Sequence, residues 1–345
     1  LRNGGVENAA GQNEGIAVFD IAGLTSMDRG ALVNWATIVA LALGDVVALD
    51  FMERVFAAKS GKIARDSCLW AAGITFIVGT CTAMLGILGG GQLGRMFTVA
   101  AKTMGYRVTV LDPDAHAPAA AFADVHLHAP FDDREALATL ASTCAAVTTE
   151  FENVNADAMR QLAQHTRVSP SGDCVAIAQD RIAEKSWINQ AGLPTAPYLP
   201  VLAAADLDGD LTPYLPGILK TARLGYDGKG QVRVDTADQA RAAYAELGDI
   251  ACVLEKRLTL ALEVSVIVTR SHPAQMAVFP VAENQHAHGI LDVSIVPARI
   301  DPALATQAQN MAKQLAETLN YIGVLAVEFF VLADNALVVN EIAPR

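Results

Sequence analysis

The sequence has no closely spaced cysteine pair and no run of basic residues. Its five cysteines are scattered, without a C-x-x-C spacing. This argues against a zinc or disulfide framework and fits a reducing cytoplasm. The formal net charge is −12. Without a basic cluster, we expect no nucleic-acid partner. A substrate that carries a phosphate remains compatible, because a few local Lys or Arg side chains are enough to bind it.

The first 83 residues differ in character from the rest. Residues 31–51 and 69–88 are apolar, and the second stretch is about long enough to span a bilayer. No early basic region with a cleavage site indicates a signal peptide. Asp45 and Asp50 are costly in lipid, and residues 85–88 are needed for the first strand of the next domain. We expect an extension of unknown role over residues 1–83, with a membrane or interfacial helix as the alternative.

Residues 84–178 predict a Rossmann-like α/β domain. A strand at 84–88 stops at a glycine-rich turn, a helical pattern runs to Met104, and residues 107–112 alternate as a second strand. Strand, glycine turn, helix and strand make a βαβ unit. Another strand is expected at 145–150 and a helix at 155–164.

Residues 179–345 predict an α+β domain. An amphipathic helix at 175–191 is closed by Gly192, and a linker follows at 193–197. Short strands are expected at 218–221, 231–234 and 251–256, with a helix at 237–247. Long strands at 263–270 and 275–282 precede a helix at 302–319 and a hairpin of residues 324–332 with 336–342. The fold class is α/β, with an α+β second part.

The glycine turn at 89–94 matches the dinucleotide pattern G-x-G-x-x-G, and Asp112 ends the second strand. Taken alone, this indicates NAD with Asp112 on a ribose. The pattern has low specificity, because any tight βα turn needs glycines. We predict that this loop does not bind NAD, because the nucleotide machinery lies in the following domain.

A second glycine-rich segment, residues 220–231, reads KTARLGYDGKGQ. It lies between two strands and is not a Walker loop, since no G-K-[ST] opens a helix. Its glycines and basic side chains are suited to a flap over phosphates. The alternative is a solvated turn.

The last hairpin predicts a metal site. If Asp334 and Asn335 form a two-residue turn, Glu328 lies directly opposite Glu341 on one face. Such like charges repel by about 3 kcal/mol at an effective dielectric near 20. Bound Mg²⁺ reverses that sign, and Asn340 would add an oxygen. The alternative is two exposed strand glutamates.

Several further residues are candidates. Glu255 ends one strand and Glu263 begins the next, which suits a nucleotide adenine or ribose. His286 and His288 share a loop at 283–291, but no third ligand is near, so zinc is not expected. Glu150 and Glu152 follow a parallel strand, at the usual ligand edge of such a sheet.

Together these segments resemble the ATP-grasp superfamily and, within it, the 5-(carboxyamino)imidazole ribonucleotide synthases. The resemblance runs from about residue 84 to 345 and rests on the ordered set GILGGGQLGRM, TEFENV, GYDGKGQ, the 284–291 loop and NEIAPR. It implies a preATP-grasp domain followed by an ATP-grasp domain. It also implies carboxylation of 5-aminoimidazole ribonucleotide with ATP, Mg²⁺ and bicarbonate, through carboxyphosphate, in a cytoplasmic enzyme that forms a dimer.

The resemblance also assigns residue roles. ATP contacts are implied for Arg181, Lys220, Gly225, Tyr226, Asp227, Gly228, Lys229, Gly230, Gln231, Glu255, Lys256, Arg257, Leu258, Glu263, His286, Asn340 and Glu341. Substrate contacts are implied for Gln92, Glu150, Tyr226, Asp227 and Lys229. Lys220, Lys229 and Arg345 are the catalytic candidates, with Arg345 in the bicarbonate pocket. Glu328 and Glu341 are the implied Mg²⁺ ligands.

One departure from the family pattern follows Arg345. The family continues with a stretch of the His-Asn-Ser-Gly-His type and about a hundred further residues, the size of a small domain. We therefore expect the chain as given to bind ATP weakly or not at all, and not to turn over. The alternatives are a sister ATP-grasp carboxylase, a formate-using purine ligase, or a membrane-tethered module that only binds a nucleotide.

Overall fold

The computed structural model describes residues 6–7, 13–14, 62, 83–223, 230–287 and 290–345. The chain forms two compact units, Leu1–Cys81 and Thr82–Arg345. In the first unit, β1 (Val6–Glu7) pairs antiparallel with β2 (Asn13–Glu14). The apolar stretch at 31–51 and most of that at 69–88 lie outside the described residues, and so does the membrane or interfacial helix considered for them. In the part of the chain that the structure describes, no helix has the length and apolar character needed to cross a membrane.

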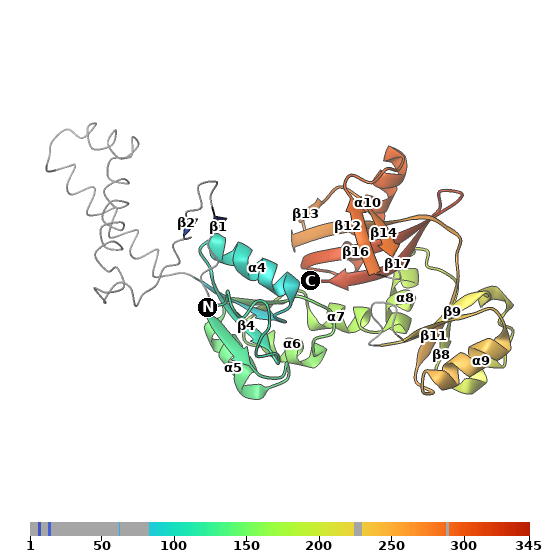
Figure 1. Ribbon diagram of the computed structural model, residues 1–345, viewed down its shortest axis with the longest axis horizontal. Coiled ribbons are helices and arrows are strands. Elements are labelled where there is room, and N and C mark those ends of the chain that lie inside the picture. The colour runs from blue at the N-terminus through green and yellow to red at the C-terminus, as the bar shows by residue number, and fades with distance from the viewer. Residues whose placement is uncertain (1–5, 8–12, 15–61, 63–82, 224–229, 288–289) are drawn as a thin grey trace. The chain divides into compact units, whose positions relative to one another are not determined.

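The second unit begins with a parallel sheet. Its strands are β3 (Met84–Leu88), β4 (Arg107–Asp112), β5 (Val125–His128), β6 (Ala146–Thr149) and β7 (Arg167–Val168), in the order β5-β4-β3-β6-β7. Helices α4 (Gln92–Thr103), α5 (Arg134–Thr143) and α6 (Ala156–Leu162) accompany it (Figure 1). This confirms the predicted α/β class, although β5 and α5 had not been predicted. Because β3 lies between β4 and β6, the loop after β3 is next to the carboxyl ends of both neighbours.

The predicted helix at 175–191 is wrong, because it is two helices. α7 (Gly172–Ala178) ends at Gln179, and α8 (Arg181–Gln190) begins after Asp180. The Asp180 carboxylate accepts hydrogen bonds from the N–H groups of Ile182 and Ala183, which caps a new helix. The Gln179 side chain donates to the carbonyl of Glu152. The break places Arg181 in the first turn of α8.

A small antiparallel sheet follows. It contains β8 (Tyr198–Val201), β9 (Gly217–Thr221), β10 (Gln231–Val234) and β11 (Cys252–Lys256), in the order β10-β9-β11-β8. Two short 3-10 helices, η3 (Ala204–Leu207) and η4 (Thr212–Tyr214), connect β8 to β9. Helix α9 (Ala237–Glu246) packs Ala240, Ala243 and Tyr244 into the same core as Leu219 and Leu254. β9 and β11 are neighbours, so their side chains meet on one face.

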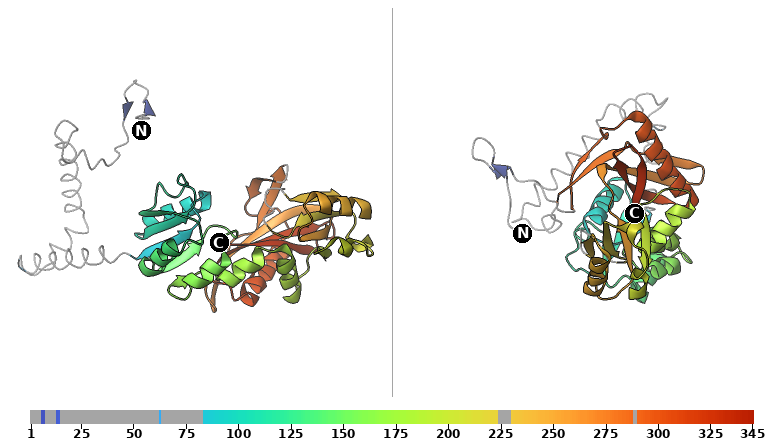
Figure 2. Two further views of the ribbon diagram at one scale, coloured as in Figure 1. Left: turned by 90° about the horizontal axis from the view of Figure 1, so that it is seen from below. Right: turned by 90° about the vertical axis from the view of Figure 1, so that its right-hand side faces the viewer.

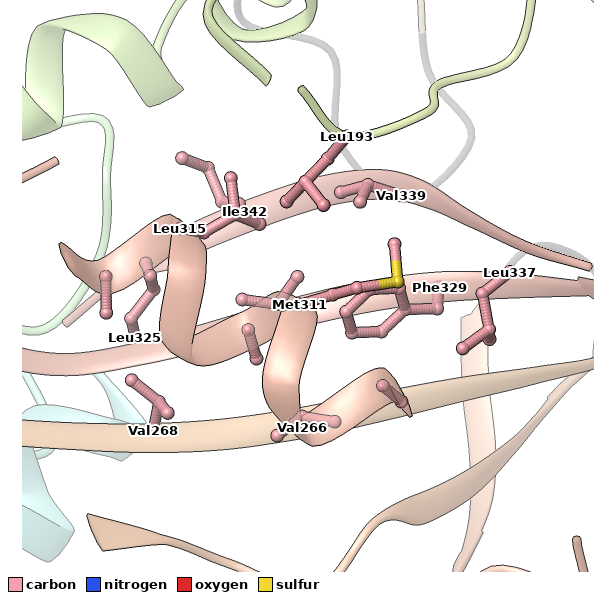
Figure 3. Close-up of a cluster of buried hydrophobic side chains, with 14 of the residues drawn as sticks. Leu193, Val266, Val268, Met311, Leu315, Leu325, Phe329, Leu337, Val339 and Ile342 are labelled. Carbon is pink, nitrogen blue, oxygen red and sulfur yellow. The ribbon is translucent and has the colours of Figure 1, made fainter. Parts of the chain in front are cut away.

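The large sheet contains β12 (Leu260–His272), β13 (Gln275–Val278), β14 (Ala282–Ala287), β15 (Ile290–Ile295), β16 (Gly323–Leu332) and β17 (Leu337–Pro344). Its order is β15-β14-β12-β16-β17, with β13 paired to β12. Figure 2 shows its long orange and red strands from two further directions. Along β12 and β16 alternate residues are buried, and α10 (Pro302–Thr318) covers that face with Met311 and Leu315, which pack near Val266 and Phe329 (Figure 3). The opposite face is left to line a site.

Two predictions in this sheet are wrong. Residues 275–282 are two strands, interrupted at 279–281. Pro280 there has no N–H to donate to a ladder. Residues 283–291 are not a loop, because most of them belong to the paired strands β14 and β15, with His286 opposite Leu291. His288 lies outside the described residues.

The final hairpin keeps the predicted pair but not the predicted turn. Glu328 pairs with Glu341, whereas Phe329 pairs with Val339, so Asn340 is an extra residue in β17. The connection is longer than two residues: the Leu332 N–H donates to the Ala336 carbonyl, and Asn335 has a left-handed φ of 64°. Asn340 forms a β-bulge that restores the register.

Candidate active site

A cavity of about 720 Å³ is lined by α8, by strands of both antiparallel sheets and by residues at the end of β17. This volume is typical of small-molecule sites. The cavity brings together these predicted residues: Arg181, Lys220, Gln231, Glu255, Lys256, Arg257, Leu258, Glu263, His286, Glu328, Asn340, Glu341 and Arg345. Gln92 and Glu150 are not among the residues that line it. Residues 224–229, with Gly225, Tyr226, Asp227, Gly228 and Lys229, lie outside the described part of the chain.

Two basic side chains of the cavity, Lys220 and Arg181, are held by carboxylates. Lys220 on β9 extends from the strand next to β11, and its Nζ lies 2.8 Å from Glu255 Oε2. Burial raises the pKa of Glu255, but the charges of Lys220 and Lys185 outweigh burial and lower this pKa to about 2. Arg181 Nη1 lies 3.2 Å from Glu341 Oε2. Cationic side chains fixed in this way are suited to bind phosphate oxygens.

Glu328 and Glu341 are directly opposite one another in the pairing of β16 with β17. Burial, and then the charges of Glu341 and Glu263, raise the pKa of Glu328 to about 7. In the described residues, no group of three or more His, Cys, Asp or Glu is placed to hold a metal ion by itself. Two opposed carboxylates and an adjacent Asn fit Mg²⁺ that takes its remaining ligands from phosphates and water.

The other end of the cavity combines backbone and ring groups. Residues 255–258 leave the small sheet where β11 ends, and Glu263 lies near the start of β12. Its Oε2 is 3.2 Å from His286 Nδ1 on β14. This edge offers amides, a carboxylate and an imidazole, which suit a base and a ribose. In the described residues, His286 belongs to no group of three or more side chains that could ligate a metal.

The base of the predicted flap is tied to β9. The Thr221 N–H donates to the Gly230 carbonyl over 2.8 Å, and Gly230 has a φ of 69°. A side-chain Cβ at Gly230 would lie 2.7 Å from Thr221 Oγ1, so glycine is required there. Gln231 follows and lines the cavity.

The glycine loop at 89–94 is filled by the chain's own acids. The Gly91 N–H donates to Glu150 Oε1 over 2.7 Å, the Gly94 N–H donates to Glu150 Oε2, and the Gly90 N–H donates to Asp112 Oδ2 over 2.6 Å. A pyrophosphate would need these same donors. The glycines are needed for another reason, since a Cβ on Gly91 would lie 2.4 Å from Glu150 Oε1.

Arg345 reaches back to the first domain. Its Nη1 lies 2.6 Å from Glu152 Oε2, and both residues line the cavity. The guanidinium retains further N–H groups that could receive a small anion. The placement is compatible with the role that the family resemblance implies for Arg345.

Sequence reasoning missed two buried residues of α8. Glu184 is 2% exposed and its Oε1 accepts a hydrogen bond from the N–H of Ile342, beside Glu341. Burial, and then the charge of Glu341, raise the pKa of Glu184 to about 8. Lys185 is 1% exposed. Arg181, Glu184 and Lys185 are spaced i, i+3 and i+4, so the sequence does contain the signal that one helix face carries all three charges.

A second cavity, of about 690 Å³, lies at the carboxyl edge of the parallel sheet. Among the described residues that line it are Arg160 and Arg223 but, unlike in the first cavity, no lysine and no glutamate. Arg160 bonds to Asp157 and Asp173, and Arg223 bonds to Asp180. The side chains expected to bind a nucleoside triphosphate and its metal ion therefore lie in the first cavity.

Comparison with known proteins agrees with this geometry. Residues 82–179 match the ribonucleotide synthetase preATP-grasp domain, and residues 186–345 match the ATP-grasp domain. The N5-carboxyaminoimidazole ribonucleotide synthase of Bacillus subtilis is 43% identical over 264 residues, which are 76% of this chain and 70% of that protein.

Two solved structures have the same fold. The Staphylococcus aureus N5-carboxyaminoimidazole synthetase complexed with ADP superimposes with a TM-score of 0.73 at 38% identity, covering 76% of this chain and 70% of that one. The Aspergillus clavatus synthase in complex with ADP and 5-aminoimidazole ribonucleotide gives 0.69 at 29% identity, covering 76% and 69%. With the domain order, the cavity and the two opposed glutamates in place, the chain belongs to the N5-carboxyaminoimidazole ribonucleotide synthase family.

Proposed function

We propose that this chain carries out the ATP- and bicarbonate-dependent carboxylation of 5-aminoimidazole ribonucleotide in purine biosynthesis. The observation that carries the proposal is the composition of the cavity. Lys220, Arg181, Glu328 and Glu341 line it together with the edge of residues 255–258, Glu263 and His286, which suits a base and a ribose. Relatives that are similar over 76% of this chain bind ADP, and one binds ADP together with 5-aminoimidazole ribonucleotide. The family membership and the charge distribution thus favour the same chemistry.

The nucleotide is proposed to lie across the cavity. Residues 255–258, Glu263 and His286 would hold its base and ribose, and Lys220 and Arg181 its phosphates. Mg²⁺, when bound, would neutralise phosphate charge and orient the terminal phosphoryl group. Glu328 and Glu341 would hold that ion, with the Asn340 oxygen near it. The flap residues 225–231 would close over the phosphates, an assignment that rests on the sequence resemblance.

The reaction would occur as two displacements. A bicarbonate oxygen attacks the terminal phosphorus of ATP, ADP leaves, and carboxyphosphate forms. The exocyclic amine of the ribonucleotide then attacks the carboxyl carbon, phosphate leaves, and the amine loses its proton. Phosphoryl transfer asks the protein mainly for positioning and charge neutralisation, so no nucleophilic side chain is required. Arg345, held by Glu152, is proposed to bind bicarbonate or carboxyphosphate.

The residues proposed for the ribonucleotide lie in the flap motif and beside the glycine loop. Tyr226, Asp227 and Lys229 are assigned to the ribonucleotide from the GYDGKGQ motif. Gln92 begins α4 beside the glycine loop and is proposed to contact the same substrate. Glu150 was expected there too, but its carboxylate oxygens accept the Gly91 and Gly94 N–H groups. We therefore propose that Glu150 shapes the loop on which Gln92 is carried.

Four broader assignments belong to the same proposal. They are a division into residues 84–178 and 179–345, a homodimeric state, a cytoplasmic location, and an extension over residues 1–83 that takes no part in the reaction. The buried free thiols of Cys144, Cys174 and Cys252 fit a reducing compartment.

The test is ADP production by the purified chain. The proposal expects ADP release that needs both bicarbonate and 5-aminoimidazole ribonucleotide, with Mg²⁺ present. The absence of any such release would instead match the expectation from the sequence that the chain as given does not turn over. Omitting each substrate in turn is the control. Release with formate in place of bicarbonate, or with a different acceptor, would instead support another ATP-grasp ligase.

A further inference from the structure

Lys185 on α8 is a fully buried lysine that does not line the cavity. Its side chain is 1% exposed, and lysine is almost never buried so completely unless it is paired. Its Nζ lies 2.7 Å from Glu255 Oε1. This contact is an ion pair between two side chains that are both almost completely buried. Lys185 therefore lies behind Glu255, on the side away from the ligand space.

The Glu255 carboxylate is shared by two lysines. Oε1 faces Lys185 and Oε2 faces Lys220, at 2.7 and 2.8 Å. Glu255 and Lys220 alone would be a neutral pair, and the ammonium would attract phosphate weakly. With Lys185 added, the three groups carry one net positive charge. Lys220 and Glu255 line the cavity and Lys185 does not, so Lys220 is the cation of the three that can meet a ligand there.

The same lysine also contacts β17. Lys185 Nζ lies 3.4 Å from the carbonyl oxygen of Asn340, the bulged residue beside Glu341. One ammonium group thus joins β11 of the small sheet to the bulge of the large sheet. The phosphate-binding lysine and the carboxylate pair lie on these two sheets, so their separation depends in part on this contact.

We propose that Lys185 is a positioning residue for nucleotide binding, which neutralises Glu255 so that the charge of Lys220 acts on the phosphates, and which ties β11 to the bulge at Asn340. The inference rests on the proposed function, because it presumes that the cavity binds a nucleotide. Lys185 itself touches no substrate in this arrangement.

The experiment measures binding of Mg·ADP and of adenosine by calorimetry, with the full chain. Lys185→Met should weaken ADP binding by about tenfold or more and leave adenosine within about twofold, since adenosine carries no phosphate. Lys185→Arg should recover most of the ADP affinity. Lys102→Met is the matched control, because it removes a helix lysine paired with Asp124 at 2.9 Å outside the cavity.

A second pair of variants separates the electrostatic role from a folding role. If Lys185 acts through Glu255, then Glu255→Gln and the double variant Lys185→Met/Glu255→Gln should bind ADP within about threefold of each other. This comparison also serves if Lys185→Met alone does not fold. A further tenfold loss in the double variant would overturn the electrostatic role through Glu255 and leave only the contact with the Asn340 carbonyl.

Three results decide between the ideas. Unchanged ADP affinity in Lys185→Met, or equal losses for ADP and adenosine, contradicts the positioning role while leaving the proposed function intact. A wild-type chain that binds neither ADP nor adenosine contradicts the proposed function itself. ADP-selective loss with recovery in Lys185→Arg supports both.

Discussion

Two regions of the molecule offer donors suited to phosphate, and they differ in what faces those donors. In the loop at 89–94, the N–H groups of Gly91 and Gly94 are occupied by Glu150 from the neighbouring strand. In the large cavity, Lys220 is held by Glu255, but Lys185 neutralises that same carboxylate from behind. The donors of the first region are already satisfied by an acid of the chain, whereas the cluster of Lys220, Glu255 and Lys185 keeps one net positive charge. A glycine pattern therefore indicates a binding loop only when no carboxylate of the chain fills it.

Removing the shared carboxylate should have the largest effect. Because the pKa of Glu255 is lowered to about 2, its contribution to stability is present above about pH 4.5 and is lost as the pH falls towards 2. Glu255→Gln should lower the free energy of unfolding by roughly 3 kcal/mol at pH 7 and by much less at pH 3. Urea unfolding at several pH values measures this difference. The surface variant Glu246→Gln is the control, and a loss that does not change with pH contradicts the prediction.

Disturbing the glycine loop should have the next largest effect on stability. A Cβ at Gly94 would lie 2.6 Å from the Gly89 carbonyl oxygen and 2.6 Å from Glu150 Oε2. Gly94→Ala should destabilise the protein by about 1–3 kcal/mol through overpacking. Gly209→Ala, at a site with no atom within 4 Å, should have little effect. Thermal unfolding of both variants provides the comparison, and equal melting temperatures would show that the loop is not tightly packed.

Neutralising either opposed glutamate should weaken Mg·ATP binding. Glu328→Gln and Glu341→Gln are each expected to lose at least about tenfold in affinity, or about 1.4 kcal/mol, because two carboxylates would hold the ion. Binding of ATP in EDTA should differ much less between these variants and the wild type. Glu317→Gln on the exposed side of α10 is the control. Calorimetric affinities for Mg·ATP that match the wild type in both variants would remove the metal assignment.

The smallest expected effect is that of NAD, which should cause no thermal shift. The donors that a dinucleotide would use are already bonded to Glu150 and Asp112. Protection by micromolar NAD, with none by 5-aminoimidazole ribonucleotide, would reverse the assignment of the first domain. ADP serves as the positive control for the assay.

Much of the fold follows from the sequence where the hydrophobic periodicity agrees with the turn and capping residues that bound it. The alternation at 107–112 and the long apolar strands near 324–332 were enough to place β4 and β16. The prediction of one helix at 175–191 was wrong because Asp180, inside this range, caps a new helix. The periodicity of the residues on either side does not reveal the break. The prediction of one strand at 275–282 was wrong at Pro280. Proline disfavours a continuous paired strand, so this residue already argued against the prediction.

The site was predicted unevenly for a physical reason. Residues that point into the cavity belong to recognisable segments, so Lys220 and Glu341 could be proposed directly. Lys185 acts through Glu255 and does not line the cavity. A lysine on an amphipathic helix is ordinarily expected to face solvent. Only the packing of β11 and β17 against α8 shows that this polar face is buried. No local pattern contains that information.

The last hairpin contains two register shifts that compensate one another, and the bulge at Asn340 is the second of them. The connection after Leu332 is one residue longer than a two-residue turn, and the extra residue in β17 cancels this offset before Glu341. Either change alone would turn the second carboxylate away from Glu328, because a slip of one residue reverses every side chain of a strand. The tip of this hairpin is exposed, yet its length is not free to drift. An insertion there would be silent only when a second change upstream of Glu341 restores the count.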